Sequence, residues 1–233
     1  MAGIGTKERS WSLWLRWVAA NALGEMVGLG ATTAVIALAF SSLDEQAGMG
    51  SVLLLFVLAV TSGAIEATVV GLAQWWAMHP WFASVTCRAW WLATLVGALV
   101  AYVLGYLPST LMSLGSDASQ SQVAEPPQWV VLLLAAGMGA VAGAILSFAQ
   151  WRVLRKRVPR AGWWVPANML AWSAGMPIIF WGIDAAQKGQ PLLQMVLLLA
   201  SCLLLSGAVV GGIHGAVLVR LAGHSKLEDV SQS

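Results

Sequence analysis

The sequence predicts an all-α, polytopic membrane protein whose six transmembrane helices form three parallel hairpin repeats about a pseudo-threefold axis. Three observations predict it: the composition, six long apolar stretches and an internal repeat. The 233 residues are 59% hydrophobic and only 9% charged, with a mean hydropathy of +0.77. Soluble domains carry about 25% charged residues. So few charges cannot cover a water-exposed surface, which argues against a soluble enzyme.

The six stretches are long enough to cross the hydrocarbon core, which takes about 20 apolar residues in a helix. Their apolar runs are continuous rather than alternating, which favours helices over barrel strands. We therefore expect one membrane domain over residues 1–233, with an external loop at 108–127 and a polar tail at 222–233. The predicted spans are residues 12–40, 50–78, 89–107, 128–151, 162–182 and 191–219.

The charges in the connections predict the orientation, because cytoplasmic loops carry an excess of Lys and Arg. Of the 12 basic residues, all but Lys188 belong to the side that holds both termini. We therefore expect both termini in the cytoplasm. The expected location is a bacterial cytoplasmic membrane, or an internal photosynthetic or respiratory membrane.

The turn between the fourth and fifth spans is strongly basic. Such a cluster sets the topology, and it also suits anionic lipid headgroups or an acidic partner. The residues in question are Arg152, Arg155, Lys156, Arg157 and Arg160.

Tryptophan is unusually frequent, with 14 residues in the chain. Tryptophans gather at membrane interfaces, where the ring is half apolar and half hydrogen-bonded. Eleven fall near the cytoplasmic span ends, and we expect them to anchor the protein at the headgroup level. They are Trp11, Trp14, Trp17, Trp75, Trp76, Trp81, Trp90, Trp91, Trp151, Trp163 and Trp164.

An internal repeat relates the spans in pairs. Residues 63–75 and 139–151 both run from Gly-Ala to Gln-Trp, and each leads through a turn into a Trp-led helix. The third copy is split between the chain ends, where residues 207–211 and 17–21 match parts of the second. All copies share one orientation, so the repeats are parallel and their axis follows the membrane normal. The predicted hairpins are residues 50–107, 128–182, and 191–220 together with 12–40.

These motifs carry a resemblance to a known kind of protein. A Gly-rich helix ending in Gln-Trp, a basic turn and a Gly-Trp-Trp start of the next helix resemble short multi-span bacterial membrane proteins with such helical-hairpin repeats. The resemblance covers most of the chain. It implies the same architecture and no particular activity.

Two carboxyl residues interrupt otherwise apolar spans. Glu25 lies eight residues beyond Trp17, and Glu66 eight residues before Gln74, which is about 12 Å along a helix in each case. We therefore expect both near the middle of the bilayer. An anion at that depth is costly, so such a residue is either a neutral group that bonds a neighbouring helix or the mark of an ion or substrate route.

Positions at which the repeats differ are the better functional candidates, because shared positions serve the common framework. The match places Glu25 level with Trp172, Glu66 level with Val210, and His214 level with Val70. For His214 we favour a buried, hydrogen-bonded imidazole, and for the two asparagines interhelical bonding. The candidate substrate-binding or ion-binding residues are Glu25, Glu66, Trp172, His214, Asn21 and Asn168.

Several chemistries have no support in the sequence. It contains no paired metal-ligand spacing, phosphate-binding loop, dinucleotide fingerprint or nucleophile elbow. The net charge of +2 is too small for a nucleic-acid reader. Haem ligation by His214 stays open, although no c-type attachment motif occurs. No cofactor is assigned, and we expect no enzyme.

Two functions fit these observations. The first is a small-solute, proton or cation transporter, or a channel-like protein, that uses midplane carboxylates. The second is a non-catalytic accessory subunit of a larger membrane complex, binding lipid, pigment or quinone, with Trp172 and Trp181 as stacking surfaces. The expected partners are membrane lipids, together with other membrane subunits or further copies of the chain.

Overall fold

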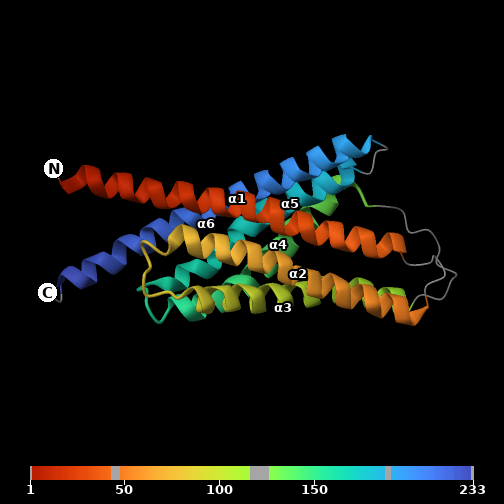
Figure 1. Cartoon of the computed structure of the whole chain (residues 1–233), viewed down its shortest axis with the longest axis horizontal. Helices are drawn as coiled ribbons and strands as arrows, with labels where there is room; N and C mark the ends of the chain where they lie inside the picture. Colours follow the sequence, from red (N-terminus) through yellow and green to blue (C-terminus); the bar gives the residue numbers. More distant parts are fainter. Residues whose placement is uncertain (1, 43–47, 116–125, 187–189, 232–233) are drawn as a thin grey trace.

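The computed structural model describes residues 2–42, 48–115, 126–186 and 190–231, and these contain six long α-helices (Figure 1). All six are long and apolar enough to cross a membrane, so the described residues form the all-helical arrangement of a six-span membrane protein that the sequence predicts. A short 3₁₀ turn, Ala161–Trp163, precedes the fifth helix. The helices are α1 (Ala2–Ser42), α2 (Met49–Met78), α3 (Cys87–Gly115), α4 (Gln128–Leu154), α5 (Trp164–Ala186) and α6 (Leu192–Ser231).

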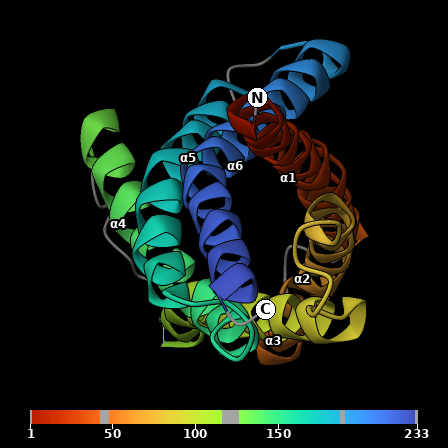
Figure 2. The same cartoon turned by 90° about the vertical axis from the view of Figure 1, so that its left-hand side faces the viewer.

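The helices form a closed ring. Each packs against its neighbours in the chain, and α6 packs against α1 (Figure 2). Both chain termini lie at one end of the bundle, which we call the termini end (Figure 1). The turns from α2 to α3 and from α4 to α5 lie at the same end, because successive helices run in opposite directions. Side chains from all six helices therefore meet along one central axis.

Three helices extend far beyond the predicted spans. Helix α3 continues through Pro108 to Gly115, so the first part of the expected loop at 108–127 is helical. Helix α6 continues to Ser231 through most of the expected tail at 222–233, and α1 begins at Ala2. The tail after Gly223 holds neither Gly nor Pro, so nothing in its composition ends the helix. Part of the predicted loop, residues 116–125, lies outside the described residues.

Small residues allow two helix pairs to approach closely. A Cβ atom on Gly143 would lie 2.5 Å from the Asn168 carbonyl oxygen, and one on Gly207 would lie 2.6 Å from that of Asn21. Side chains larger than hydrogen would therefore separate α4 from α5 and α6 from α1. This is the close packing that small residues at four-residue spacing provide in lipid.

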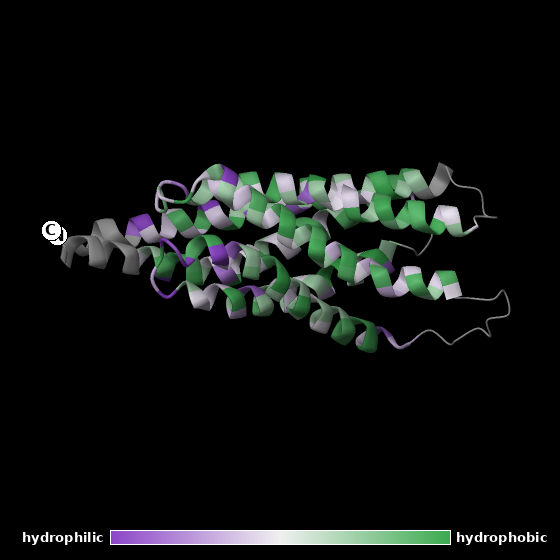
Figure 3. Cartoon of the chain, turned by 90° about the horizontal axis from the view of Figure 1, so that it is seen from below, coloured by the Kyte–Doolittle hydropathy of each residue, from purple (hydrophilic) through white to green (hydrophobic). Residues whose placement is uncertain are grey.

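The outer surface of the bundle is apolar along most of its length, and hydrophilic residues gather toward the termini end (Figure 3). Leu133 on α4 and Leu193 on α6 are among many large exposed apolar side chains. A surface of this kind fits contact with lipid acyl chains.

The tryptophans expected at the membrane interface include an exposed group and a buried group. The expectation is wrong for the buried group. Trp11, Trp76 and Trp163 are exposed, as the belt requires. Trp17 and Trp90, with Trp164, are instead 0% exposed. These three side chains lie inside the ring of helices, where apolar burial replaces contact with headgroups.

Candidate functional site

Three tryptophans meet on the bundle axis close to the termini end. The ring centroids of Trp17 and Trp90 are 6.3 Å apart, those of Trp17 and Trp164 5.9 Å, and those of Trp90 and Trp164 6.0 Å. All three contacts are edge-to-face, an arrangement that aligns the positive ring edge with the negative ring face. We call these residues the Trp triad. Because they fill the axis, they close the termini end of the bundle.

Each indole of the Trp triad donates a hydrogen bond to a side chain of the neighbouring Gly-rich helix. An indole N–H only donates, so each acceptor must offer a lone pair. The bonds run from Trp17 Nε1 to His214 Nδ1 (2.8 Å), from Trp90 Nε1 to Gln74 Oε1 (3.2 Å) and from Trp164 Nε1 to Gln150 Oε1 (3.0 Å).

His214 therefore accepts the indole hydrogen bond of Trp17, as Gln74 and Gln150 accept those of the other two indoles. The sequence match placed His214 one helical turn away, level with Val70. Gly207 packs against the Asn21 backbone as Gly143 packs against that of Asn168. These matching contacts support the alignment of α6 with α4 that the hydrogen bonds give. The sequence match was wrong by one turn because small residues recur at every fourth position of α6. Such a pattern aligns with α4 equally well after a shift of four residues.

A second polar layer lies one turn beyond the Trp triad. Its side chains donate hydrogen bonds to the backbone carbonyls of the Trp triad and to side chains of neighbouring helices. Nearly every polar group in the layer therefore has a hydrogen-bond partner. Asn21 Nδ2, Thr94 Oγ1 and Asn168 Nδ2 donate to the carbonyl oxygens of Trp17 (2.8 Å), Trp90 (3.0 Å) and Trp164 (2.8 Å). Gln74 Nε2 donates to Asn21 Oδ1 (2.8 Å), and Gln150 Nε2 donates to Thr94 Oγ1 (3.0 Å) and Gln74 Oε1 (3.3 Å).

Beyond this layer is a small, largely enclosed cavity, which we call the inner cavity. Its volume of about 20 Å³ leaves room for about one water molecule. No haem fits against His214 in such a space. All six candidate binding residues line it: Asn21, Glu25, Glu66, Asn168, Trp172 and His214.

Glu25 is the most unusual group in the inner cavity. It is 1% exposed, and its Oε2 atom has no hydrogen-bond partner among the described residues. Burying a polar atom without a hydrogen-bond partner costs free energy. A partner that binds to Glu25 and leaves again would relieve that cost. His214 faces the same cavity, and because its Nδ1 accepts from Trp17, its neutral ring carries the proton on Nε2.

Glu66 has a partner that the sequence analysis missed. The Tyr102 hydroxyl donates a hydrogen bond to Glu66 Oε2. The Tyr102 ring packs where a Cβ on Gly63 would lie, 2.8 Å away, so only glycine admits the ring there. The available signal was that the chain has just two tyrosines, Tyr102 and Tyr106, one turn apart in an apolar span.

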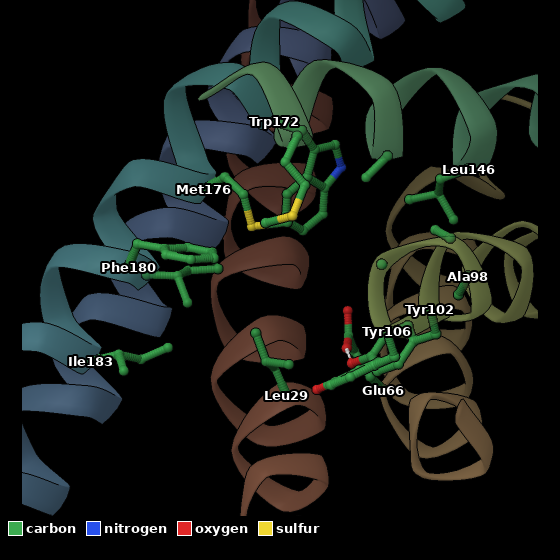
Figure 4. Close-up of a pocket in the computed structure, with 15 residues that line it drawn as sticks. Leu29, Glu66, Ala98, Tyr102, Tyr106, Leu146, Trp172, Met176, Phe180 and Ile183 are labelled. Carbon is green, nitrogen blue, oxygen red and sulfur yellow. Dashed lines mark hydrogen bonds between the residues drawn. The ribbon is translucent and has the colours of Figure 1, made fainter. Parts of the chain in front are cut away.

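A second, larger cavity adjoins the first and is partly open. We call it the outer cavity; its volume is about 350 Å³. Glu66, Ala98, Leu146 and Trp172 line both cavities, so Glu66 stands at their junction. Figure 4 shows Tyr102 and Tyr106 beside Glu66, with α5 side chains opposite. Those α5 side chains are Trp172, Met176, Phe180 and Ile183.

Loss of the Tyr102 hydroxyl is expected to destabilise the protein by about 1.5 kcal/mol, because Tyr102→Phe leaves the half-buried Glu66 oxygen without its donor. The matched control is Tyr106→Phe, which removes a hydroxyl that lines the same cavity without reaching Glu66. Thermal unfolding in one detergent measures both variants. Equal losses for the two variants would contradict the assigned hydrogen bond.

The remaining candidates lie apart from this site. The side chains of the basic turn are exposed, and the Arg155 guanidinium stacks 4.8 Å from the Trp151 ring centroid. Trp181 is 47% exposed and does not line either cavity, so it does not join Trp172 in one stacking surface. The exposed basic residues are Arg152, Arg155, Lys156, Arg157 and Arg160.

Among the described residues no cluster of three or more His, Cys, Asp or Glu side chains is placed to hold a metal ion. Comparisons of the chain with family models, with curated proteins and with solved structures give no match. The candidate site therefore rests on its own geometry: two carboxyl groups between a closed tryptophan layer and an open, aromatic-lined cavity.

Proposed function

We propose that the chain is a membrane transporter that moves a small solute by binding and releasing protons at Glu25 and Glu66. The observation that carries the proposal is the unpartnered Glu25 Oε2 atom in a cavity that Glu66 shares. Ionisable residues inside a membrane bundle usually mark ion or substrate routes. The proposed role is non-enzymatic.

Proton exchange follows from the chemistry of the pair. Two carboxyl groups that line one apolar cavity repel each other when both are ionised, so the pair favours a state that holds at least one proton. A positively charged solute that reaches Glu66 would displace that proton, and its departure would let the proton return. Glu66 lines both cavities, so a solute in the outer cavity has access to the pair.

The Trp triad supplies the other requirement of a transporter, a barrier on one side. Its three indoles fill the axis at the termini end while the outer cavity opens elsewhere. In this proposal the structure is one of two states, and the other requires the indoles to separate. The similar hydrogen bonds of Trp17, Trp90 and Trp164 support a pseudo-threefold arrangement of the hairpins.

The proposed setting is a bacterial cytoplasmic or internal energy-converting membrane, with the termini end in the cytoplasm. The support is the charge asymmetry of the sequence, which puts all but one of the 12 basic residues on that side. The exposed basic turn, residues 152–160, is then placed to contact anionic lipid headgroups.

The alternative is an accessory subunit that binds a planar cofactor. One observation favours it: the outer cavity is apolar and Trp172 lines it. The protein purified in mild detergent separates the two functions. Visible absorption or co-purifying chains support the subunit, and a colourless preparation free of other chains supports the transporter.

Proton flux tests the proposal directly. In liposomes with an imposed pH gradient and a small organic cation present, we expect Glu25→Gln and Glu66→Gln each to lower protein-dependent proton flux at least tenfold. Each substitution keeps the side-chain shape and removes the exchangeable proton. Asp184→Asn is the matched control, because Asp184 is exposed at the far end of α5. Unchanged flux in both glutamate variants would refute proton coupling at this pair.

A further inference from the structure

The outer cavity has the features of a site for one class of solute. We propose that it binds a small apolar molecule with a single positive charge, a lipophilic amine or quaternary ammonium ion, whose charged group lies against Glu66. This inference rests on the proposed transport function and names its substrate class.

The charge of the two cavities favours a cation. Their lining contains no Lys or Arg, and its only acidic groups are Glu25 and Glu66. The remaining titratable groups that face the pair are His214, Tyr102 and Tyr106, and each is uncharged when the imidazole holds one proton and the phenols hold theirs. When the pair holds one proton, it keeps one negative charge. That charge attracts a cation and repels an anionic solute.

The walls of the outer cavity suit the rest of such a molecule. Aromatic rings attract cations through their negative faces, and Trp172, Tyr102, Tyr106 and Phe180 all line the cavity. The other lining side chains are mainly aliphatic or thioether groups, such as Leu29. The volume of about 350 Å³ falls within the range of small-molecule sites, roughly 300–1,000 Å³.

The size difference between the cavities fixes how the molecule lies. The inner cavity, at about 20 Å³, holds about one water molecule and cannot admit an apolar body. The body must stay in the outer cavity, so its charged end reaches Glu66 at the junction. Glu25 behind it has a free Oε2 atom, which adds attraction without direct contact.

Three probes of similar shape test the inference by equilibrium dialysis of the detergent-purified protein against protein-free micelles. They are phenyltrimethylammonium, its neutral analogue tert-butylbenzene, and the anion benzenesulfonate. We expect the cation to bind at least tenfold more tightly than the neutral analogue, a difference of about 1.4 kcal/mol, and the anion not to bind. Equal binding of the cation and the neutral analogue would overturn the inference.

Two variants locate the site. Glu66→Gln is expected to weaken cation binding at least tenfold, and Ala101→Phe is expected to abolish it by filling the outer cavity while both carboxyls remain. Leu111→Phe, on the exposed face of the same helix, is the control for the second variant. Size-exclusion profiles identify variants that misfold. Full cation binding by folded Ala101→Phe protein would overturn the inference.

The two proposals fail in different ways. Cation binding that depends on Glu66 without any glutamate-dependent proton flux would support the binding site and overturn transport. Proton flux that depends on both glutamates without cation binding would support transport and overturn the assigned substrate class.

Discussion

Gly139→Ala is expected to destabilise the bundle by about 3 kcal/mol or more, because overpacking of a tight interface costs about 1–3 kcal/mol and here the obstacle is rigid backbone. An added Cβ would overlap the Trp172 carbonyl oxygen and come within 3.0 Å of the Met176 Cβ atom. Relief requires α4 to move away from α5, which carries Trp172 at both cavities. Thermal unfolding in detergent or lipid measures the loss.

Gly137→Ala provides a closely matched control. It makes the same chemical change two residues earlier on the same helix, where a Cβ atom meets nothing within 4 Å. Alanine is the better helix former by about 1 kcal/mol, so this variant is expected to be neutral or slightly more stable. If both variants unfold at the same temperature as the wild type, the close α4–α5 approach is wrong.

Gln150→Leu is expected to cost about 3 kcal/mol, the second large effect. Gln150 accepts the Trp164 indole N–H (3.0 Å) and donates to Thr94 (3.0 Å) and Gln74 (3.3 Å), which links α4 to three other helices. Leucine has similar volume but leaves the buried indole N–H without an acceptor, and it removes the hydrogen bonds to Thr94 and Gln74 as well. An unsatisfied buried group alone costs about 1–3 kcal/mol.

The control for this substitution is Gln128→Leu, at the exposed start of α4, where the side chain donates a hydrogen bond to Asp184 (3.1 Å). We expect a change within about 0.5 kcal/mol there, as for most surface substitutions. Near-ultraviolet circular dichroism adds a second readout, because Gln150→Leu should alter the signal of the packed Trp triad and Gln128→Leu should not. A Gln150→Leu protein of wild-type stability and spectrum would contradict the polar layer.

The stability of the Trp triad bears on the proposed transport cycle. Separating three buried indoles breaks three edge-to-face contacts, each worth about 0.5–1.5 kcal/mol, besides exposing their hydrogen bonds. A closed termini end is therefore the favoured state without solute. Binding of a cation at Glu66 would need to supply comparable free energy to open it.

The sequence by itself determined the membrane fold and the six candidate residues. Burial in lipid demands continuous apolar helices, so composition and length were enough to place the spans. Helical rise alone predicted that Glu25 and Glu66 lie about two turns from Trp17 and Gln74, and both line the cavity beyond the polar layer. Charge counts likewise predicted the orientation, which the proposed function retains.

Only the tertiary structure decided which polar groups pair. A Trp at a span end has the same local sequence whether it faces headgroups or the bundle axis, so Trp17, Trp90 and Trp164 were predicted at the interface and lie buried. The four-residue period of small residues fits several alignments of α6 equally well. The position of His214 beside Trp17 could therefore be found only from the contacts in the structure. Tyr102 and Glu66 are 36 residues apart in the chain, and their hydrogen bond exists because α2 and α3 pack side by side.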